Sequence, residues 1–275
     1  MNKLLQNLSE YWHKLNPLMI KNKKVIFVSI FLVVFLFSGF WTWKEYENNR
    51  PLKIGFVSDI HAANDKVRMA DEEPAGYPRK YKEYFSLALD EMKREKVDAI
   101  VALGDNTNVG NPKYAQSLMK IMKEKKVSVI WVKGNHDRAK TKVMTHFGID
   151  KTYYFQDVKN WRIIVLDSSF TGKDYTGEID AEQMKWLKEA LKTDSRVIIA
   201  MHHPIFDKEN LDNIYPIYKD FVETISNSAN VEDVFFGHFH KYDMVKEING
   251  VKYHFVPSLT GNEKTPTFKI IEFEK

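Results

Sequence analysis

The chain has 275 residues, of which 44% are hydrophobic, and a formal net charge of +4; this suits one large or two small globular domains. It has no cysteine, so disulfide bonds and thiolate metal sites are excluded, and any metal must be held by His, Asp, Glu or Asn. Seven of the 41 basic and three of the 37 acidic residues lie in the first 52 positions, so the remainder carries 34 of each sign. A neutral domain offers no broad surface to a polyanion, so we expect no nucleic-acid partner and disfavour a nuclease.

The first predicted element is a transmembrane helix over residues 25–43. Its sequence, VIFVSIFLVVFLFSGFWTW, is uncharged, and at about 1.5 Å per residue it would cross a hydrocarbon core of roughly 30 Å. Three lysines crowd its N-terminal side and two tryptophans lie near its C-terminal end, so the positive-inside rule places residues 1–24 in the cytoplasm. A cleaved signal peptide is the alternative, but the long leading segment and the lack of a small-x-small cleavage site favour an uncleaved anchor. We therefore predict a single-pass protein of the cell membrane, in which a linker over residues 44–52 leads to an extracytoplasmic domain over residues 53–275.

From Lys53 onward, short β-rich runs alternate with helical ones, which predicts βαβ units and an α/β fold. Strands are predicted over residues 53–58, 99–103, 127–132, 161–166, 197–201, 234–236, 253–256 and 268–273, and helices over residues 81–96, 114–125 and 181–191. The pair Asn249 and Gly250 is a hairpin signal. The closely spaced strands around it indicate a second, more antiparallel sheet packed on the first.

Five predicted strands end in side chains that commonly bind metals. The five tips read SDIH (58–61), GDN (104–106), GNHD (134–137), HHP (202–204) and GHFH (237–240). Each tip alone could be a turn or a helix cap, but six of the nine histidines lie in these tips. Because ligands bind at the carboxyl ends of strands in open α/β sheets, the five tips together predict one ligand site.

The donors in these tips are imidazoles, carboxylates and one amide, a set that suits Mn, Fe or Zn. The seven candidate ligands are Asp59, His61, Asp105, Asn135, His202, His238 and His240. Seven ligands are too many for one ion. They predict two divalent ions, about 3.5–4 Å apart, that share one carboxylate.

The motifs D-x-H, G-D, G-N-H-D, H-x-P and G-H-x-H, in this order, resemble the calcineurin-like metallophosphoesterase superfamily over about residues 53–275. The resemblance implies a four-layer αββα sandwich of two mixed β-sheets. It also implies that one ion is held by three residues, the other ion by three more, and that Asp105 bridges the two. The first set is Asp59, His61 and His240, and the second set is Asn135, His202 and His238.

The same resemblance assigns roles to the neighbouring residues. His136 would lie beside the scissile bond, where it stabilises developing charge or protonates the leaving alkoxide. Asp137 would orient the loop, with a direct metal bond as the less favoured reading, and His203 would lie behind the ligands or on the substrate side. After Asp105 this chain reads Asn-Thr-Asn (106–108), where many relatives have a hydrophobic residue and a later acid, so the surroundings of Asp105 are expected to differ.

The predicted reaction is hydrolysis of a phosphate ester by a hydroxide that bridges the two metal ions. A phosphodiester is the favoured substrate, drawn from small molecules or lipids. A phosphomonoesterase or nucleotidase, a lipid pyrophosphatase, and a non-catalytic metal-binding interaction scaffold remain as alternatives, because fold membership does not choose among them.

Overall fold

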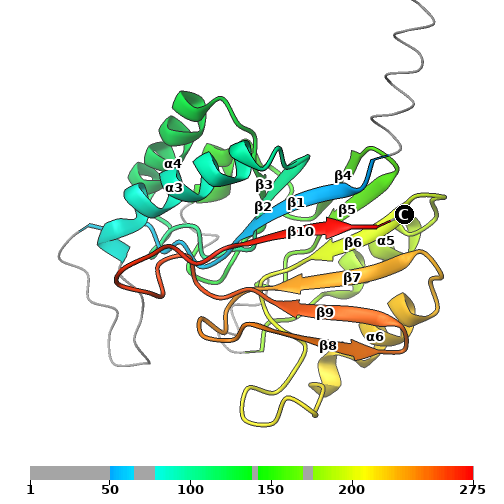
Figure 1. Cartoon of the computed structure of the whole chain (residues 1–275). Helices are drawn as coiled ribbons and strands as arrows, with labels where there is room; N and C mark the ends of the chain where they lie inside the picture. Colours follow the sequence, from blue (N-terminus) through cyan, green and yellow to red (C-terminus); the bar gives the residue numbers. More distant parts are fainter. Residues whose placement is uncertain (1–49, 65–77, 138–141, 170–175, 275) are drawn as a thin grey trace, which may run out of the picture. The chain divides into compact units, whose positions relative to one another are not determined.

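Two mixed β-sheets form the centre of this computed structural model, which describes residues 50–64, 78–137, 142–169 and 176–274. The first sheet has the order β10-β1-β2-β3 and contains Lys269–Phe273, Leu52–Val57, Ala99–Ala102 and Ile130–Trp131. The second has the order β4-β5-β6-β7-β9-β8 and contains Tyr154–Val158, Trp161–Val165, Arg196–Ala200, Val231–Phe236, Val251–Phe255 and Met244–Ile248. Strands β1 to β3 are parallel, as are β5, β6, β7 and β9, while β10, β4 and β8 run antiparallel at edges. The predicted α/β fold with two mixed sheets is confirmed (Figure 1).

Alternate residues of the strands build the core between the two sheets. In β1, Ile54 and Phe56 are fully buried in the same apolar cluster as Ile163 of β5 and Phe235 of β7. The rings of Phe56 and Phe235 stack with centroids 3.9 Å apart. Since side chains alternate across a strand, the opposite faces of both sheets are left for helices.

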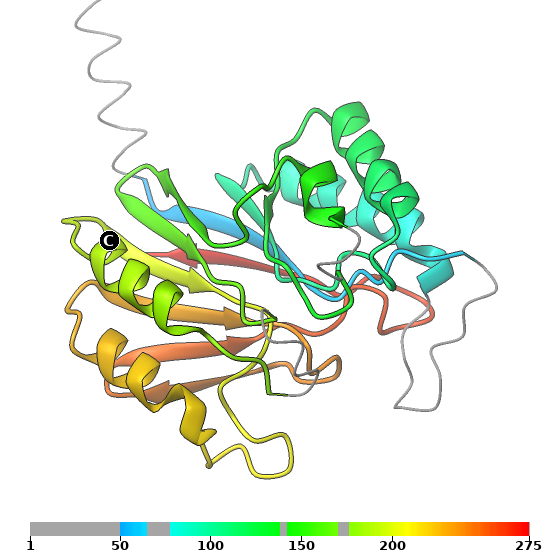
Figure 2. The ribbon, with the colours of Figure 1, turned by 180° about the vertical axis from the view of Figure 1, so that it is seen from behind.

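Helices cover those outer faces. Helices α3 (Tyr81–Arg94) and α4 (Pro112–Lys125) pack on the first sheet, and α5 (Ala181–Ala190) and α6 (Lys219–Ser226) pack on the second (Figure 2). Two of these helices have side-chain caps, because Asn111 accepts a hydrogen bond from Lys113 N and Asp180 accepts one from Gln183 N; such residues satisfy amide groups that the first helical turn leaves unpaired. Short 3-10 helices occur at Pro78–Lys80, Val143–Phe147 and Pro216–Tyr218.

The order of the strands differs from the sequence expectation near the C-terminus. The hairpin at Asn249 and Gly250 is confirmed, since Ile248 pairs with Val251. However, β8 and β9 extend the larger sheet, whose interior is parallel, and β10 joins β1 in the first sheet. Strands β4 and β8 and helix α6 were not predicted, and the strand expected over residues 127–132 is limited to Ile130–Trp131.

The compact unit spans Pro51–Lys275. The predicted membrane helix over residues 25–43 and the segment before it lie outside the described residues. Among the helices within residues 50–274 that the structure describes, none is both long and apolar enough to cross a bilayer.

Candidate dinuclear metal centre

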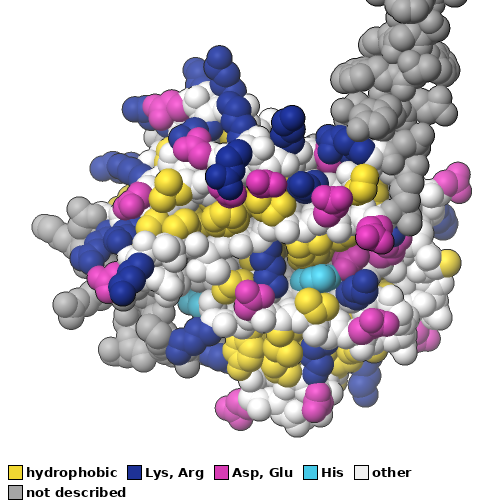
Figure 3. Space-filling model, in the orientation of Figure 1, with side chains coloured by type: hydrophobic (Ala, Val, Ile, Leu, Met, Phe, Trp, Pro, Cys, Tyr) yellow, Lys and Arg dark blue, Asp and Glu magenta, His cyan; other side chains and the backbone are white. Residues whose placement is uncertain are grey.

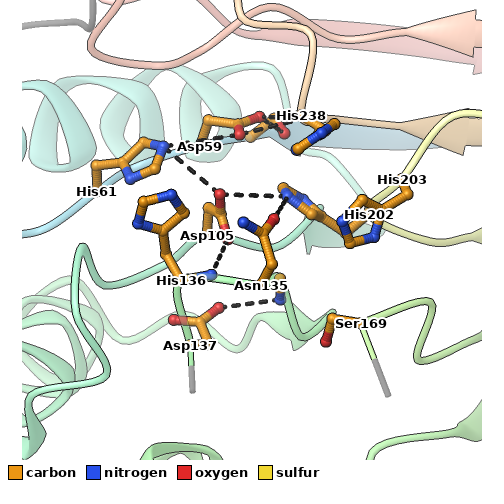
Figure 4. Close-up of polar contacts among 12 residues, drawn as sticks. Asp59, His61, Asp105, Asn135, His136, Asp137, Ser169, His202, His203 and His238 are labelled. Carbon is orange, nitrogen blue, oxygen red and sulfur yellow. Dashed lines mark hydrogen bonds and ion pairs between the residues drawn. The ribbon is translucent and has the colours of Figure 1, made fainter. Parts of the chain in front are cut away.

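The seven predicted ligands converge at the carboxyl ends of five strands, and Figure 4 shows most of them around Asp105. The first sheet contributes four of them and the second sheet contributes three. From the first sheet come Asp59 and His61 after β1, Asp105 after β2 and Asn135 after β3, and from the second come His202 after β6 and His238 and His240 after β7. The candidate centre therefore forms only where the edges of two different sheets meet.

The backbone at this edge is strained. Asp59, His61, Asp105 and His238 have φ angles of 49°, 47°, 49° and 66°, in the left-handed region that side chains other than glycine adopt at a cost on the order of 1 kcal/mol or more. Inter-loop hydrogen bonds hold two of them there, because Asp59 N donates to Gly104 O at 3.1 Å and His61 N donates to Asp105 O at 2.8 Å. Strain of this kind concentrates at functional sites.

Gly134 is required by close approach. A Cβ atom at this position would overlap the backbone and carboxylate of Asp105. The first residue of the GNHD motif therefore lets the loop that bears Asn135 and His136 pass directly against the central carboxylate.

The first group of donors consists of Asp59, His61 and His240. The Nε2 atoms of the two histidines are 3.1 Å apart, and Oδ1 of Asp59 lies 3.8 Å from His61 Nε2 and 3.3 Å from His240 Nε2. The other carboxylate oxygen, Oδ2, accepts hydrogen bonds from Ser58 Oγ at 2.5 Å and from His238 N at 3.0 Å. One oxygen thus fixes the carboxylate while the other faces the two imidazoles.

Asp105 connects this group to the second one. Its Oδ1 accepts a hydrogen bond from His136 N at 2.8 Å, and its Oδ2 lies 3.6 Å from His61 Nε2 and 3.2 Å from His202 Nε2. Nε2 of His202 is also 3.1 Å from Asn135 Oδ1. The position of Asp105 between the two groups is the one that a shared ligand needs.

His202 is oriented as a metal ligand usually is. Its Nδ1 donates a hydrogen bond to Leu103 O at 2.8 Å, which leaves the Nε2 lone pair directed at the centre. A donor atom of His238 lies within 4.8 Å of donor atoms of His202 and His203.

Burial and charge set the protonation of the metal-free centre. Burial lowers the pKa of His61 to about 3 and that of His238 to about 3, so both imidazoles are neutral. Burial opposes ionisation of Asp59, but the neighbouring His240 outweighs it and the pKa of Asp59 lies below its usual value. For His202, burial is overcome by the charge of Asp105, which raises its pKa to about 9.

These observations test whether the donor set fits two metal ions. Ionised carboxylates, the neutral imidazoles of His61 and His238 and the amide of Asn135 lie together, and the proton held by His202 compensates negative charge that a cation would otherwise balance. In the described part of the chain, Nδ1 of His61 is a buried nitrogen without a hydrogen bond. The residues fit two divalent cations of the kind that imidazole and carboxylate bind.

His136 and Asp137 lie beside the candidate ligands. Nδ1 of His136 donates to Asn108 O at 2.7 Å, so its Nε2 remains for substrate, and its half-buried ring stands edge-on to that of His61 with centroids 4.7 Å apart. Asp137 is fully buried and accepts hydrogen bonds from Asn106, Thr107 and Gly134 N, which orients the loop. Burial, followed by the charge of Asp105, raises the pKa of Asp137 to about 6.

His203 lies behind the ligands. Its Nδ1 is 2.9 Å from Ser168 Oγ, which also accepts a hydrogen bond from His203 N at 3.0 Å. The Ser168 hydroxyl therefore holds His203 through both its backbone N–H and its ring. A ring nitrogen of His203 also lies within 4.8 Å of donor atoms of His202 and His238.

Sequence reasoning missed several residues of this site. Residues 106–108 were expected to change the surroundings of Asp105, but their partners, Asp137 and His136, were not foreseen. Ser168 was overlooked although it follows a predicted strand in the polar run DSS (167–169), the same kind of signal that identified the other five tips.

Comparison with known proteins identifies the family of this chain. A model of the family "Calcineurin-like phosphoesterase" matches residues 52–242. A probable cyclic nucleotide phosphodiesterase of Fibrobacter succinogenes is 27% identical over 222 residues, which cover 76% of this chain and 80% of that protein. A 3',5'-cyclic adenosine monophosphate phosphodiesterase of Pseudomonas aeruginosa is 26% identical over 153 residues, or 54% of either chain. Among solved structures, a dimetal phosphatase from Danio rerio superposes with a TM-score of 0.67 at 15% identity, covering 82% of this chain and 94% of that one.

The fold and the donor set define a metal-dependent phosphoesterase. Because the family model matches most of the sequence, the chain belongs to the calcineurin-like phosphoesterase family. The resemblance stated from the five motifs is confirmed.

Proposed function

We propose that this enzyme hydrolyses a small-molecule phosphodiester with two divalent metal ions. The ions would be held by the seven residues at the five strand tips, with Asp105 shared. Bound there, two divalent cations supply the Lewis-acid chemistry that polarises a phosphoryl oxygen and acidifies water. The observation that carries the proposal is the placement of the Asp105 carboxylate between the two donor groups, at 3.6 Å from His61 Nε2 and 3.2 Å from His202 Nε2.

Residues of the chain supply the remaining chemistry. The carbonyl of Asn108 fixes the Nδ1 proton of His136, so Nε2 is the atom that exchanges a proton with the leaving oxygen. The hydrogen bond from His136 N to Asp105 holds this imidazole beside the shared ligand. Complete retention of the donor set supports an enzyme over a non-catalytic scaffold.

A phosphodiester is favoured by the printed names of the relatives. Those from Fibrobacter succinogenes and Pseudomonas aeruginosa are named as cyclic nucleotide phosphodiesterases, and a relative from Arcobacter nitrofigilis, 29% identical over 122 residues, is named as a probable glycerophosphodiester phosphodiesterase. On the face seen in Figure 3, basic and acidic side chains are interspersed, which suits a small substrate better than a nucleic acid.

The activity test uses the full chain in detergent, stripped of metal and refilled with Mn, Zn or Fe. We expect metal-dependent hydrolysis of an aryl phosphodiester at a rate at least about tenfold above that of the matching aryl phosphomonoester, with cyclic nucleotides and glycerophosphodiesters assayed in parallel. A larger rate with the monoester would reverse the substrate assignment. Loading with two ions but no turnover of any ester would favour the scaffold.

We also propose that residues 25–43 anchor the enzyme in the cell membrane with its catalytic domain outside the cytoplasm. The uncharged stretch of nineteen residues, with lysines before it and tryptophans at its end, supports this proposal.

The orientation can be measured because the chain has no cysteine. A thiol reagent that cannot cross membranes is expected to label Gln116→Cys, an exposed position, in right-side-out vesicles. Ser9→Cys, in the predicted cytoplasmic segment, is expected to react only in inverted vesicles. The opposite labelling pattern would show that the catalytic domain faces the cytoplasm. Release of the protein by a high-salt or carbonate wash would show that residues 25–43 do not anchor it in the membrane.

A further inference from the structure

Strand β3 leads to Asn135 and His136 of the site, yet it is the shortest strand of its sheet. It contains only Ile130 and Trp131, and it pairs with β2 on one side. Its other edge is the edge of the sheet. Such an edge leaves an N–H and a C=O group without a strand partner.

A side chain from the second sheet takes the place of that missing strand. The hydroxyl of Tyr154, in β4, accepts a hydrogen bond from Trp131 N and donates one to Trp131 O, both at 3.0 Å. Burial raises the pKa of Tyr154 to about 12, so the hydroxyl keeps the proton that it donates. The backbone of β3 is thereby tied to the neighbouring sheet two residues before Lys133.

Lys133 makes a second tie. Its side chain is almost fully buried, and Nζ lies 2.9 Å and 3.2 Å from the two oxygens of Asp167, which follows β5. Asp167 is itself fixed, because it accepts hydrogen bonds from Thr152 Oγ1 at 2.6 Å and Ser169 N at 3.0 Å.

The support for Asp167 reaches the outer helical layer. Gln183 of α5 accepts a hydrogen bond from Asp167 N at 2.7 Å and donates one to Asp167 O at 3.0 Å. The carboxylate that holds Lys133 is therefore anchored through both its side chain and its backbone.

We propose that Tyr154 and the ion pair of Lys133 with Asp167 form a positioning clamp, which sets the loop over residues 134–137 against the second sheet. The candidate centre needs this, because Asn135 and His136 come from the first sheet while His202 and His238 come from the second. A misplacement of about 1 Å in such a loop can reduce catalysis by about 10²-fold. None of the three clamp residues belongs to the groups of side chains that could hold a metal, so we expect them to act through the loop.

The position of the ion pair favours this role over simple stabilisation. A buried ion pair is weak evidence for stability, because the cost of removing both charges from water offsets their attraction. Lys133, one member of this pair, directly precedes Gly134, the residue that passes against Asp105. The inference rests on the proposed phosphoesterase activity and adds the residues that hold its loop in place.

The test compares Asp167→Asn and Tyr154→Phe with a matched control in the full chain. Asp233→Asn is the control, because the buried Asp233 carboxylate also has a side-chain partner, His254 Nε2 at 2.6 Å, and lies within β7 away from the tips. We expect both clamp variants to lower kcat about 10-fold or more at nearly unchanged KM. The control is expected to have a lower melting temperature than the parent but a kcat within twofold of the parent value.

Two readouts do not depend on turnover. In metal-free protein, amide hydrogen exchange over residues 130–137 is expected to be faster in Tyr154→Phe and unchanged in Asp233→Asn. In metal titrations, both clamp variants are expected to bind the ion near Asn135 and His202 at least fivefold more weakly than the parent. The affinity for the ion near Asp59 and His240 is expected to stay the same.

The double variant Lys133→Met with Asp167→Asn separates positioning from stability. Removing both charges is expected to recover melting temperature relative to Asp167→Asn, because no buried charge is left unpaired, while kcat stays low. Recovery of kcat together with melting temperature in the double variant would overturn the clamp. So would a kcat of Tyr154→Phe within twofold of the parent, or a loss of kcat in Asp233→Asn equal to that in the clamp variants. An inactive parent chain would instead contradict the proposed function, and the exchange and titration readouts would still decide the clamp.

Discussion

Replacing Asp105 with Asn is expected to reduce metal-dependent phosphodiester hydrolysis on the order of 10³-fold. The neutral amide keeps an acceptor for His136 N but removes the charge that lies 3.6 Å from His61 Nε2 and 3.2 Å from His202 Nε2. Changes to residues that merely support a ligand cost about 10–100-fold in metal affinity or activity, so loss of the shared carboxylate is expected to exceed that range. Steady-state kinetics across a metal titration measure the effect.

The number of metal ions bound per chain shows whether the loss of activity comes from loss of a shared ligand. We expect Asp105→Asn to bind fewer than two ions per chain at metal concentrations that fill the parent protein, because both donor groups lose the same oxygen. Asp233→Asn, which also removes a buried carboxylate, is expected to bind two. Two tightly bound ions in Asp105→Asn would show that Asp105 is not shared.

Replacing His136 with Ala is expected to lower kcat about 10²–10⁴-fold, the usual contribution of a general acid or base, while two metal ions still bind. Its Nδ1 is engaged with Asn108 O, so the reactive nitrogen is Nε2, and its backbone N–H to Asp105 is kept in the variant. The exposed His146 provides the matched control, and His146→Ala is expected to retain full activity.

The leaving group shows what His136 does. If Nε2 protonates the departing oxygen, the defect of His136→Ala is expected to be large with an alkyl leaving group and small with a nitrophenolate, which departs without a proton. An equal defect with both would assign His136 to stabilisation of charge on the phosphoryl group instead. Loss of one metal ion in the variant would make His136 a ligand, as its 4.8 Å grouping with His61 and Asp105 permits.

The candidate site was readable from the sequence because its residues sit at one kind of position. Each ligand follows an apolar run within a few residues, as Asp59 follows β1 and Asp105 follows β2. Parallel strands bring their carboxyl ends to the same edge, so local order along the chain was enough to predict convergence. The role of each residue in metal binding and catalysis remains a prediction for the measurements above.

Other features depended on contacts between distant segments. The pairing of Leu52 with Phe273 places β10 in the first sheet, and no pattern near either residue indicates it. The length of strand β3 was overestimated because five of the six residues 127–132 are apolar, while only Ile130 and Trp131 align with β2.

The sequence by itself determined the class of fold, the donor types and the strand tips that carry them, since these follow from strand periodicity, the absence of cysteine and residue chemistry. The tertiary structure alone decided how the tips are held together. Tyr154 binds Trp131 from another sheet, and Lys133 meets Asp167 across 34 positions of sequence. Such contacts depend on how two sheets pack over a shared core, a relation that local sequence patterns do not encode.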